Sequence, residues 1–285
     1  MAKRTILAST GTLVGRINGY DITLVSRIFP PLMEEGLIAG GELMMLNSYY
    51  DRMDAVAEEW KNAGIAFPVL HCEKDVGTFF SDAGTLLSSG DTAAAESTVS
   101  HALDLFLQNC EMAAKVHAKR MVLHLWGGRN SDAHLSMNRD LLEKCREIIR
   151  PYGVRLLIEN IPSAVRDPLT NWRDLLPLSK DVGLIFDTRF GNLHRQMEEI
   201  WADRDIVPHI EHIHISDHLG AERDFSSLRP ILHPGEGMID FDRFVTILDE
   251  KHYSGTVTLE SPVIMEGGAD GDKLRRTLIW MNERF

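Results

Sequence analysis

Short apolar segments alternate with longer amphipathic segments along the whole chain. Eight segments are apolar and short enough to be strands: 5–10, 41–48, 67–71, 121–126, 154–160, 182–187, 209–218 and 256–261. In the stretches that follow them, apolar residues recur at three- and four-residue spacing, which predicts helices over 21–37, 51–63, 99–113, 135–150, 170–178, 194–203, 241–250 and 273–285. This alternation predicts an α/β fold built on a parallel sheet.

Eight strand and helix pairs within 285 residues match the size of a single (β/α)8 TIM barrel, so we expect one barrel domain spanning residues 1–285. The alternative is an open doubly wound sheet, but the first strand-to-helix turn lacks the GxGxxG phosphate loop that favours it. Pro30 and Pro31 are expected to disturb the first helix and Pro177 the fifth. The polar stretch 219–237 predicts a long loop.

The segment 209–218, HIEHIHISDH, has two different faces if it is a strand. Side chains alternate across a strand, so His212 and His214 share one face while Ile213 and Ile215 share the other. One face can therefore pack on helices while the other binds a ligand. Of the two histidines, His212 lies deeper in the barrel and is expected to be a hydrogen-bonded core residue.

Three other predicted strands end on an acidic residue. LLIEN ends with Glu159 and Asn160, LIFD closes on Asp187, and VTLE closes on Glu260. The carboxyl ends of barrel strands meet at the face where active sites lie. Two Glu, one Asp and one His at the ends of four strands therefore suggest a metal site.

The alternation within each strand tests whether these candidates point into the barrel. If Glu159 faces inward, Leu157 shares the interior and the intervening apolar residues face the helices. The same alternation places His71 and His124 inside at the ends of their strands, with Trp126 at the rim. All the candidates fall on the inner side, which favours a shared site.

Charge and cysteine usage narrow the class of partner. The chain has 30 Lys and Arg against 42 Asp and Glu, a net charge of −12, which disfavours nucleic acid as a partner. The three cysteines are scattered and form no CxxC pair, so neither disulfides nor a zinc cluster is expected, and a reducing, cytoplasmic setting fits. No window is apolar enough for a membrane span or a signal-peptide core.

The segments IEN, FDT, HISD, PGEGMIDF and TLES occur in the order found in the xylose isomerase-like barrel superfamily, which the chain therefore resembles. That superfamily includes sugar and sugar-phosphate isomerases and epimerases, inosose dehydratases and the endonuclease IV group. The resemblance implies one divalent metal ion bound by Glu159, Asp187, His214 and Glu260. Three carboxylates and one imidazole suit Mn²⁺ best, with Mg²⁺, Co²⁺ and Zn²⁺ as alternatives.

The resemblance also implies a reaction and a set of substrate contacts. We expect an isomerase or epimerase of a small sugar, sugar phosphate or hydroxy-keto compound that works through an enediolate, with Glu159 and Glu260 as acid and base on opposite faces of the substrate. The expected partner is thus a small sugar or polyol-ketone, and a homo-oligomer is compatible with the sequence. The residues predicted to contact the substrate are His71, His124, Trp126, Arg189 and Glu236.

Two positions depart from the family pattern. The family commonly has DxxH at the sixth strand, where this chain reads DTRF and has Phe190 in place of the His. Arg189 or His194 could substitute from the same loop. The arginine that many epimerases carry after HxxD is also out of register, and Arg223 is the nearest candidate. His218 and His233 are expected to be solvated.

These departures keep three alternatives open. An inosose-type dehydratase would use the same scaffold to expel a hydroxyl group as water. An endonuclease IV-like enzyme would need further metal ligands, and the chain lacks the DxH that follows HxxD in that group. A barrel that binds a sugar without turnover is the third alternative.

Overall fold

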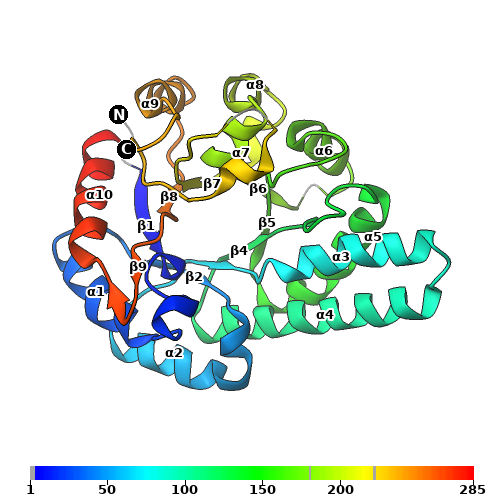
Figure 1. The fold of residues 1–285 in the computed structure, drawn as a ribbon, viewed down its shortest axis with the longest axis horizontal. Coiled ribbons are helices and arrows are strands. Elements are labelled where there is room, and N and C mark those ends of the chain that lie inside the picture. The colour runs from blue at the N-terminus through cyan, green and yellow to red at the C-terminus, as the bar shows by residue number, and fades with distance from the viewer. Residues whose placement is uncertain (1–3, 180, 221–222) are drawn as a thin grey trace.

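A closed barrel of eight parallel strands forms the centre of the molecule (Figure 1). The computed structural model describes residues 4–179, 181–220 and 223–285, so residues 221 and 222 of the expected loop lie outside the described part. The strands pair in chain order and β8 returns to β1, which confirms the predicted (β/α)8 fold. Their bounds are β1 Thr5–Ser9, β2 Gly41–Met44, β3 Val69–His71, β4 Arg120–Leu123, β5 Arg155–Glu159, β6 Gly183–Asp187, β7 Ile210–Ile215 and β8 Thr256–Leu259.

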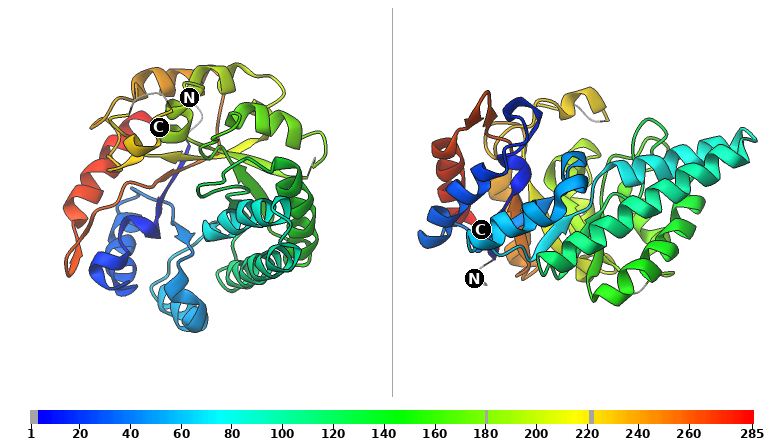
Figure 2. Two further views of the ribbon diagram at one scale, coloured as in Figure 1. Left: turned by 45° about the vertical axis from the view of Figure 1, so that its right-hand side comes forward. Right: turned by 90° about the horizontal axis from the view of Figure 1, so that it is seen from below.

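Helices surround the barrel and pack their apolar faces on the outer faces of the strands (Figures 1 and 2). Among the described residues, none of these helices is both long enough and apolar enough to cross a membrane. The helix bounds are α1 Thr23–Glu34, α2 Met53–Asn62, α3 Asp75–Ser88, α4 Thr92–Lys115, α5 Leu135–Ile149, α6 Pro168–Leu175, α7 Thr188–Leu193, α8 Met197–Ala202, α9 Phe241–Glu250 and α10 Gly271–Arg284.

Strand residues divide between two apolar clusters, as the alternation predicts. The inner cluster lies within the barrel and consists of Leu7, Val69, Val122, Leu157 and Ile185. The alternate residues of the same strands belong to the outer cluster beneath the helices. Burying each such side chain contributes roughly 1.5–3 kcal/mol, so a register slip in any strand would be costly.

The inner cluster comes from β1 and β3 to β6, while β2, β7 and β8 contribute buried polar side chains to the interior. Glu42 from β2, His212 from β7 and Thr258 from β8 are fully buried, and they hydrogen-bond to one another through the imidazole. The inward position predicted for His212 and its assignment to the core are therefore confirmed. Glu42 and Thr258 thus bind β7, the strand that also carries His214, through the ring of His212.

Helices α3 and α4 form a hairpin that extends beyond the barrel (Figures 1 and 2), and α3 was not predicted. Two glycines weaken the helical signal of α3, because glycine disfavours helix interiors. Tertiary contact explains them. A Cβ at Gly77 would lie 2.1 Å from the carbonyl oxygen of His124, and one at Gly84 would lie 2.5 Å from Cβ of His134. Close packing here requires the absence of a side chain.

Prolines act differently in two predicted helices. α1 continues through Pro30 and Pro31, and the buried Phe29 and Leu32 on the same turn hold it against the core. α6 begins earlier than predicted, at Pro168, where the side chain of Asp167 accepts a hydrogen bond from the amide of Thr170 at 2.9 Å. It ends at Leu175, before Pro177.

The helix predicted over 194–203 is present as the shorter α8, and the short helix α7 before it was not predicted. α7 begins directly after β6 and α8 follows, separated by Arg195 with a φ of 53°. The side chain of Asp187 caps α7 by accepting the amide of Phe190 at 2.9 Å. A short antiparallel pair of strands, β9 Ile264–Met265 and β10 Gly268–Ala269, precedes α10 and was not predicted.

Candidate metal centre

The four predicted ligands come together at the carboxyl ends of neighbouring strands. Glu159 and Asp187 are the last residues of β5 and β6, His214 is the last but one of β7, and Glu260 directly follows β8. Glu159, Asp187 and His214 are at most 1% exposed, and the side chain of Glu260 is 10% exposed. Strand order therefore places three carboxylates and one imidazole in one buried cluster.

His214 is at the centre of this cluster. Its Nδ1 lies 3.0 Å from Oε1 of Glu159 and 3.4 Å from Oε1 of Glu260. Donor atoms of Asp187, His214 and Glu260 lie within 4.8 Å of one another, and so do donor atoms of His71, Glu159 and His214. Each of these two sets is compact enough to hold one cation, and His214 belongs to both.

Three buried carboxylate oxygens in the cluster have no hydrogen-bond partner among the described residues, and one of them, Oε2 of Glu159, faces the ring of His124. Oδ1 of Asp187 accepts the amide of Phe190, but its Oδ2 has no hydrogen-bond partner among the described residues. Oε1 of Glu260 is likewise buried without a hydrogen bond in the described part of the chain. Buried charge without compensation is strongly unfavourable. A divalent cation would provide that compensation, so the residues fit such an ion.

Burial acts to raise the pKa of all three carboxyl groups, but the resulting pKa values differ. It raises the pKa of Asp187 to about 6 and the pKa of Glu260 to about 7, even though Arg189 opposes the shift at Asp187 and His214 opposes it at Glu260. Burial also acts to raise the pKa of Glu159, but the histidines His124 and His214 outweigh it and hold that pKa well below its usual value.

His71 and His124 lie beside Glu159, on the inner side of the barrel where the alternation placed them. Oε2 of Glu159 is 2.6 Å from Nε2 of His124 and 3.5 Å from Nε2 of His71. Nδ1 of His71 lies 2.7 Å from the carbonyl oxygen of Cys72, which orients its Nε2 toward the carboxylate. Both rings therefore border the cluster.

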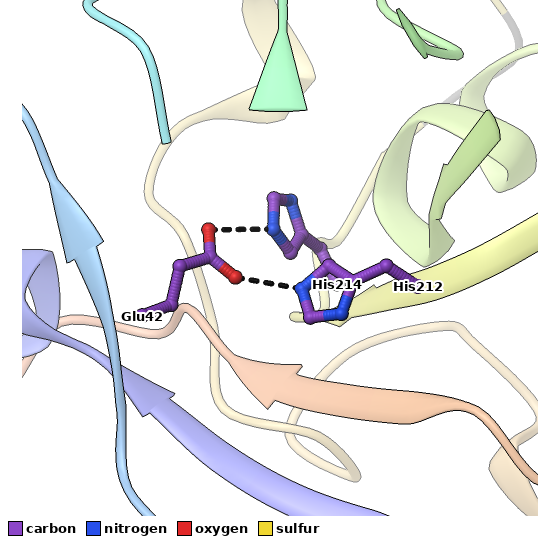
Figure 3. Close-up of side chains that lie close together, drawn as sticks. All are labelled: Glu42, His212 and His214. Carbon is purple, nitrogen blue, oxygen red and sulfur yellow. Dashed lines mark hydrogen bonds and ion pairs between the residues drawn. The ribbon is translucent and has the colours of Figure 1, made fainter. Parts of the chain in front are cut away.

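Glu42 on β2 was not among the predicted site residues. It is fully buried, and its two oxygens face the rings of His212 and His214 (Figure 3). Oε2 lies 2.7 Å from Nε2 of His212 and Oε1 lies 2.9 Å from Nε2 of His214. Its signal in the sequence is an acidic residue inside the apolar strand GELMM, where burial without a partner would be unfavourable.

The segment after β6 contains Arg189 and His194, the two residues suggested as substitutes for the histidine that Phe190 replaces. Arg189 is 7% exposed, and its Nη1 donates to the carbonyl oxygen of Leu228 at 3.0 Å. Its positive charge acts on Asp187, whose pKa it lowers against the larger effect of burial. His194 instead accepts the amide of Ser163 at 3.1 Å through Nε2, so it is engaged with the loop after β5.

Arg223 and Glu236 are engaged away from the carboxylates in the structure. Arg223 is exposed and donates to the carbonyl oxygen of Arg166 at 2.6 Å. Glu236 caps its own turn by accepting the amide of His233 at 3.1 Å, and it pairs with Lys273 of α10 at 3.1 Å. Both described contacts of Glu236 thus lie on the α10 side of the barrel.

Trp126 and two histidines are more buried than predicted for rim or solvated residues. Trp126 is fully buried, and its indole nitrogen has no partner among the described residues. The prediction that His218 and His233 are solvated is wrong. Nε2 of His218 lies 3.0 Å from the side-chain Nδ2 of Asn192 in α7, and Nδ1 of His233 lies 2.9 Å from the hydroxyl of Thr277 in α10. Both histidines are at most 3% exposed.

Comparisons with known proteins agree with this architecture. The sequence model of the xylose isomerase-like TIM barrel family matches residues 37–284. A search of curated protein sequences finds no match.

Several solved structures resemble the chain over its whole length. An apo structure of the 3-keto-D-glucoside 4-epimerase YcjR from E. coli has a TM-score of 0.68 and 18% identity, over 99% of this chain and 100% of that one. A D-allulose 3-epimerase from Methylomonas sp. has a TM-score of 0.69 and 12% identity, over 100% and 99%. The IOLI protein with a zinc atom has a TM-score of 0.69 and 16% identity, over 99% of each chain. At such identities the likeness shows the fold.

Proposed function

The chain belongs to the xylose isomerase-like TIM barrel family, and we propose that it is a metal-dependent isomerase or epimerase of a small sugar, sugar phosphate or hydroxy-keto compound. The observation that carries the proposal is the buried cluster of Glu159, Asp187, His214 and Glu260 at the mouth of the barrel, where carboxylate oxygens have no hydrogen-bond partner within the described part of the chain. The neighbours named as epimerases, and the zinc atom named with IOLI, support the same function.

Those four residues would hold the ion, with Mn²⁺ favoured and Mg²⁺, Co²⁺ and Zn²⁺ as alternatives. A bound divalent ion polarises a carbonyl and its neighbouring hydroxyl, which acidifies the C–H bond between them. Side chains of the protein carry out the proton transfers and bind the substrate.

We assign the proton transfers to Glu159 and Glu260. β6 and β7 separate the two strands that carry them, so the two carboxyl groups enter the cluster from different sides. One removes the substrate C–H proton to give an enediolate, and the other returns a proton on the opposite face. His71, His124 and Arg189 contact the substrate oxygens. Trp126 and Glu236, which the sequence also suggested, have no described contact with this cluster.

The test is removal and return of the metal. The purified chain is stripped with a chelator and assayed on a panel of ketoses, ketose phosphates and hydroxy-keto compounds in deuterated water. We expect activity to vanish and to return with Mn²⁺ or Co²⁺, with solvent deuterium at the epimerised or isomerised carbon. Full activity after complete metal removal would contradict the proposal.

The mass of the product distinguishes an isomerase or epimerase from the closest alternative, a dehydratase. The exact reaction is open because Phe190 replaces the substrate-binding histidine of the family pattern. A product lighter by one water would identify an inosose-type dehydratase. Tight sugar binding without any deuterium exchange would identify a non-catalytic barrel. Cleavage of abasic DNA at low salt would identify an endonuclease IV-like enzyme, against the net charge of −12.

A further inference from the structure

We propose that Glu42 is the positioning residue of the metal centre: it fixes the ring of His214 so that Nδ1 faces Glu159 and Glu260. This inference rests on the proposed function, because it concerns how the chain prepares the imidazole to bind the ion. The evidence is the arrangement of Glu42, His212 and His214 on β2 and β7 (Figure 3).

The hydrogen bond from His214 to Glu42 keeps a proton on Nε2 of the ring. A carboxylate only accepts hydrogen bonds, so Nε2 of His214, at 2.9 Å from Oε1 of Glu42, is a donor. Nδ1 also faces carboxylates, 3.0 Å from Glu159 and 3.4 Å from Glu260, and a cation held by those two residues would replace the proton on Nδ1 while Glu42 retains the one on Nε2. Histidines that bind metals commonly donate their other nitrogen to a carboxylate, which orients the ring and increases its basicity.

His212 in turn fixes Glu42. Its Nε2 donates to Oε2 of Glu42 at 2.7 Å, and its Nδ1 contacts the hydroxyl of Thr256. The hydroxyl of Thr258 lies 3.1 Å from the same Nε2. Each oxygen of Glu42 thus receives one ring N–H, and the carboxylate has little freedom to rotate.

The same contacts argue against a second cation at this place. Donor atoms of Glu42, His212 and His214 do lie within 4.8 Å of one another. Both oxygens of Glu42 already accept hydrogen bonds, whereas Asp187 and Glu260 each keep a buried oxygen without one among the described residues. The carboxylate oxygens that would favour a cation therefore lie on the Nδ1 side of His214.

Metal affinity of the full chain tests the inference. In E42Q the carboxamide offers one acceptor and one donor, so one of the two ring N–H groups loses its partner. We expect the stripped variant to bind Mn²⁺ about 10- to 100-fold more weakly than the wild type in calorimetric titration. H212Q keeps the bond between Glu42 and His214, so its loss of affinity should be smaller.

Glu73 provides the matched control. It is also buried, but it accepts a hydrogen bond from the hydroxyl of Tyr50 at 2.8 Å and has no described contact with His214. E73Q should therefore leave the affinity for Mn²⁺ unchanged. Circular dichroism of each stripped variant shows whether it is folded before the titration.

A second measurement on the wild type needs no substitution. Nitrogen-15 NMR of the Zn²⁺-loaded chain should show the proton of His214 on Nε2. A proton on Nδ1, or E42Q binding Mn²⁺ as tightly as the wild type, would overturn the inference while the proposed function stands. A wild-type chain that binds neither ion would overturn both.

Discussion

At the scale of single residues, Arg189 bears on which class of substrate the site binds. Its guanidinium carbon lies 4.9 Å from the centre of the Phe190 ring, and its described hydrogen bond goes to a neutral carbonyl. A buried guanidinium is well suited to a carboxylate or a phosphate, which it can bind through two parallel hydrogen bonds. The position next to Asp187 brings that charge to the side of the candidate metal centre.

We therefore expect R189M to discriminate between substrates. The Michaelis constant for phosphorylated or carboxylate-bearing substrates should rise about tenfold or more, which corresponds to about 1.4 kcal/mol, while neutral sugars change little. Steady-state kinetics on matched pairs of sugars and sugar phosphates measures this. R229M, an exposed arginine in the loop after β7, is the control. Equal changes for neutral and anionic substrates would exclude this role.

A residue that is not itself a candidate ligand also shapes the cluster. Glu42 contacts one ring nitrogen of His214, while Glu159 and Glu260 approach the other ring nitrogen. The imidazole is consequently held at both nitrogens, and β2 contributes to the cluster although no candidate ligand comes from it.

At the scale of elements, the loop after β5 depends on side chains from two other segments. Asp132 accepts the amides of Ala164 and Arg166, both at 2.8 Å. His194, which follows α7, accepts the amide of Ser163 at 3.1 Å. These bonds fix the loop that leaves Glu159, and they tie it to the segment that leaves Asp187.

His194 makes this junction sensitive to acid. Burial, with the nearby charge of Arg223, lowers the pKa of His194 from 6.5 to about 4. The unfolded chain therefore binds this proton first, so the free energy of unfolding falls as the pH drops from about 6.5 toward 4. The contribution should be about 2 kcal/mol, reduced from the full shift by solvent at the edge of the ring.

Urea unfolding at pH 7 and pH 4.5 measures that loss. H194Q removes the titrating ring, so the difference in unfolding free energy between the two pH values should shrink. H209Q, at a half-buried histidine before β7, should keep the wild-type difference. An unchanged difference in H194Q would contradict the prediction.

At the scale of the whole molecule, Arg4, which directly precedes β1, joins the first strand to α9 and to the C-terminal Phe285. Its side chain is 3% exposed and pairs with Asp249 of α9 at 2.5 Å. It also donates to the carbonyl oxygens of Tyr253 and Phe285 at 3.2 and 3.4 Å. The pairing of β1 with β8 thus has a polar anchor just before its first residue.

Removing this anchor should destabilise the closed barrel. R4M leaves Asp249 and two carbonyl groups without their donor, and we expect it to lower the free energy of unfolding by about 2–4 kcal/mol. R27M breaks an exposed pair with Asp21, whose atoms are 3.6 Å apart, and should change stability by less than about 0.5 kcal/mol. Urea denaturation of both variants measures the contrast, and equal effects would argue against the anchor.

The sequence by itself determined the barrel and the inner position of the candidate ligands. Alternation within a strand is a local property of the backbone, and parallel strands bring their carboxyl ends to one face, so the pattern of residues alone is enough to group Glu159, Asp187, His214 and Glu260. The confirmed inner and outer clusters show why this works: one face of each strand must meet the helices.

Only the tertiary structure decided which residues support that site and how its loops are packed. Glu42 and His214 are 172 positions apart, and nothing local to β2 identifies the histidine as its partner. The glycines of α3 hid the helix from sequence-based prediction, because they are required by close contacts with other elements. Gly77, for example, packs against the carbonyl group of His124. Likewise, His218 and His233 meet Asn192 of α7 and Thr277 of α10, which lie far from them in the sequence. Such contacts depend on closure of the barrel, which brings distant segments together and which the period of a single strand does not encode.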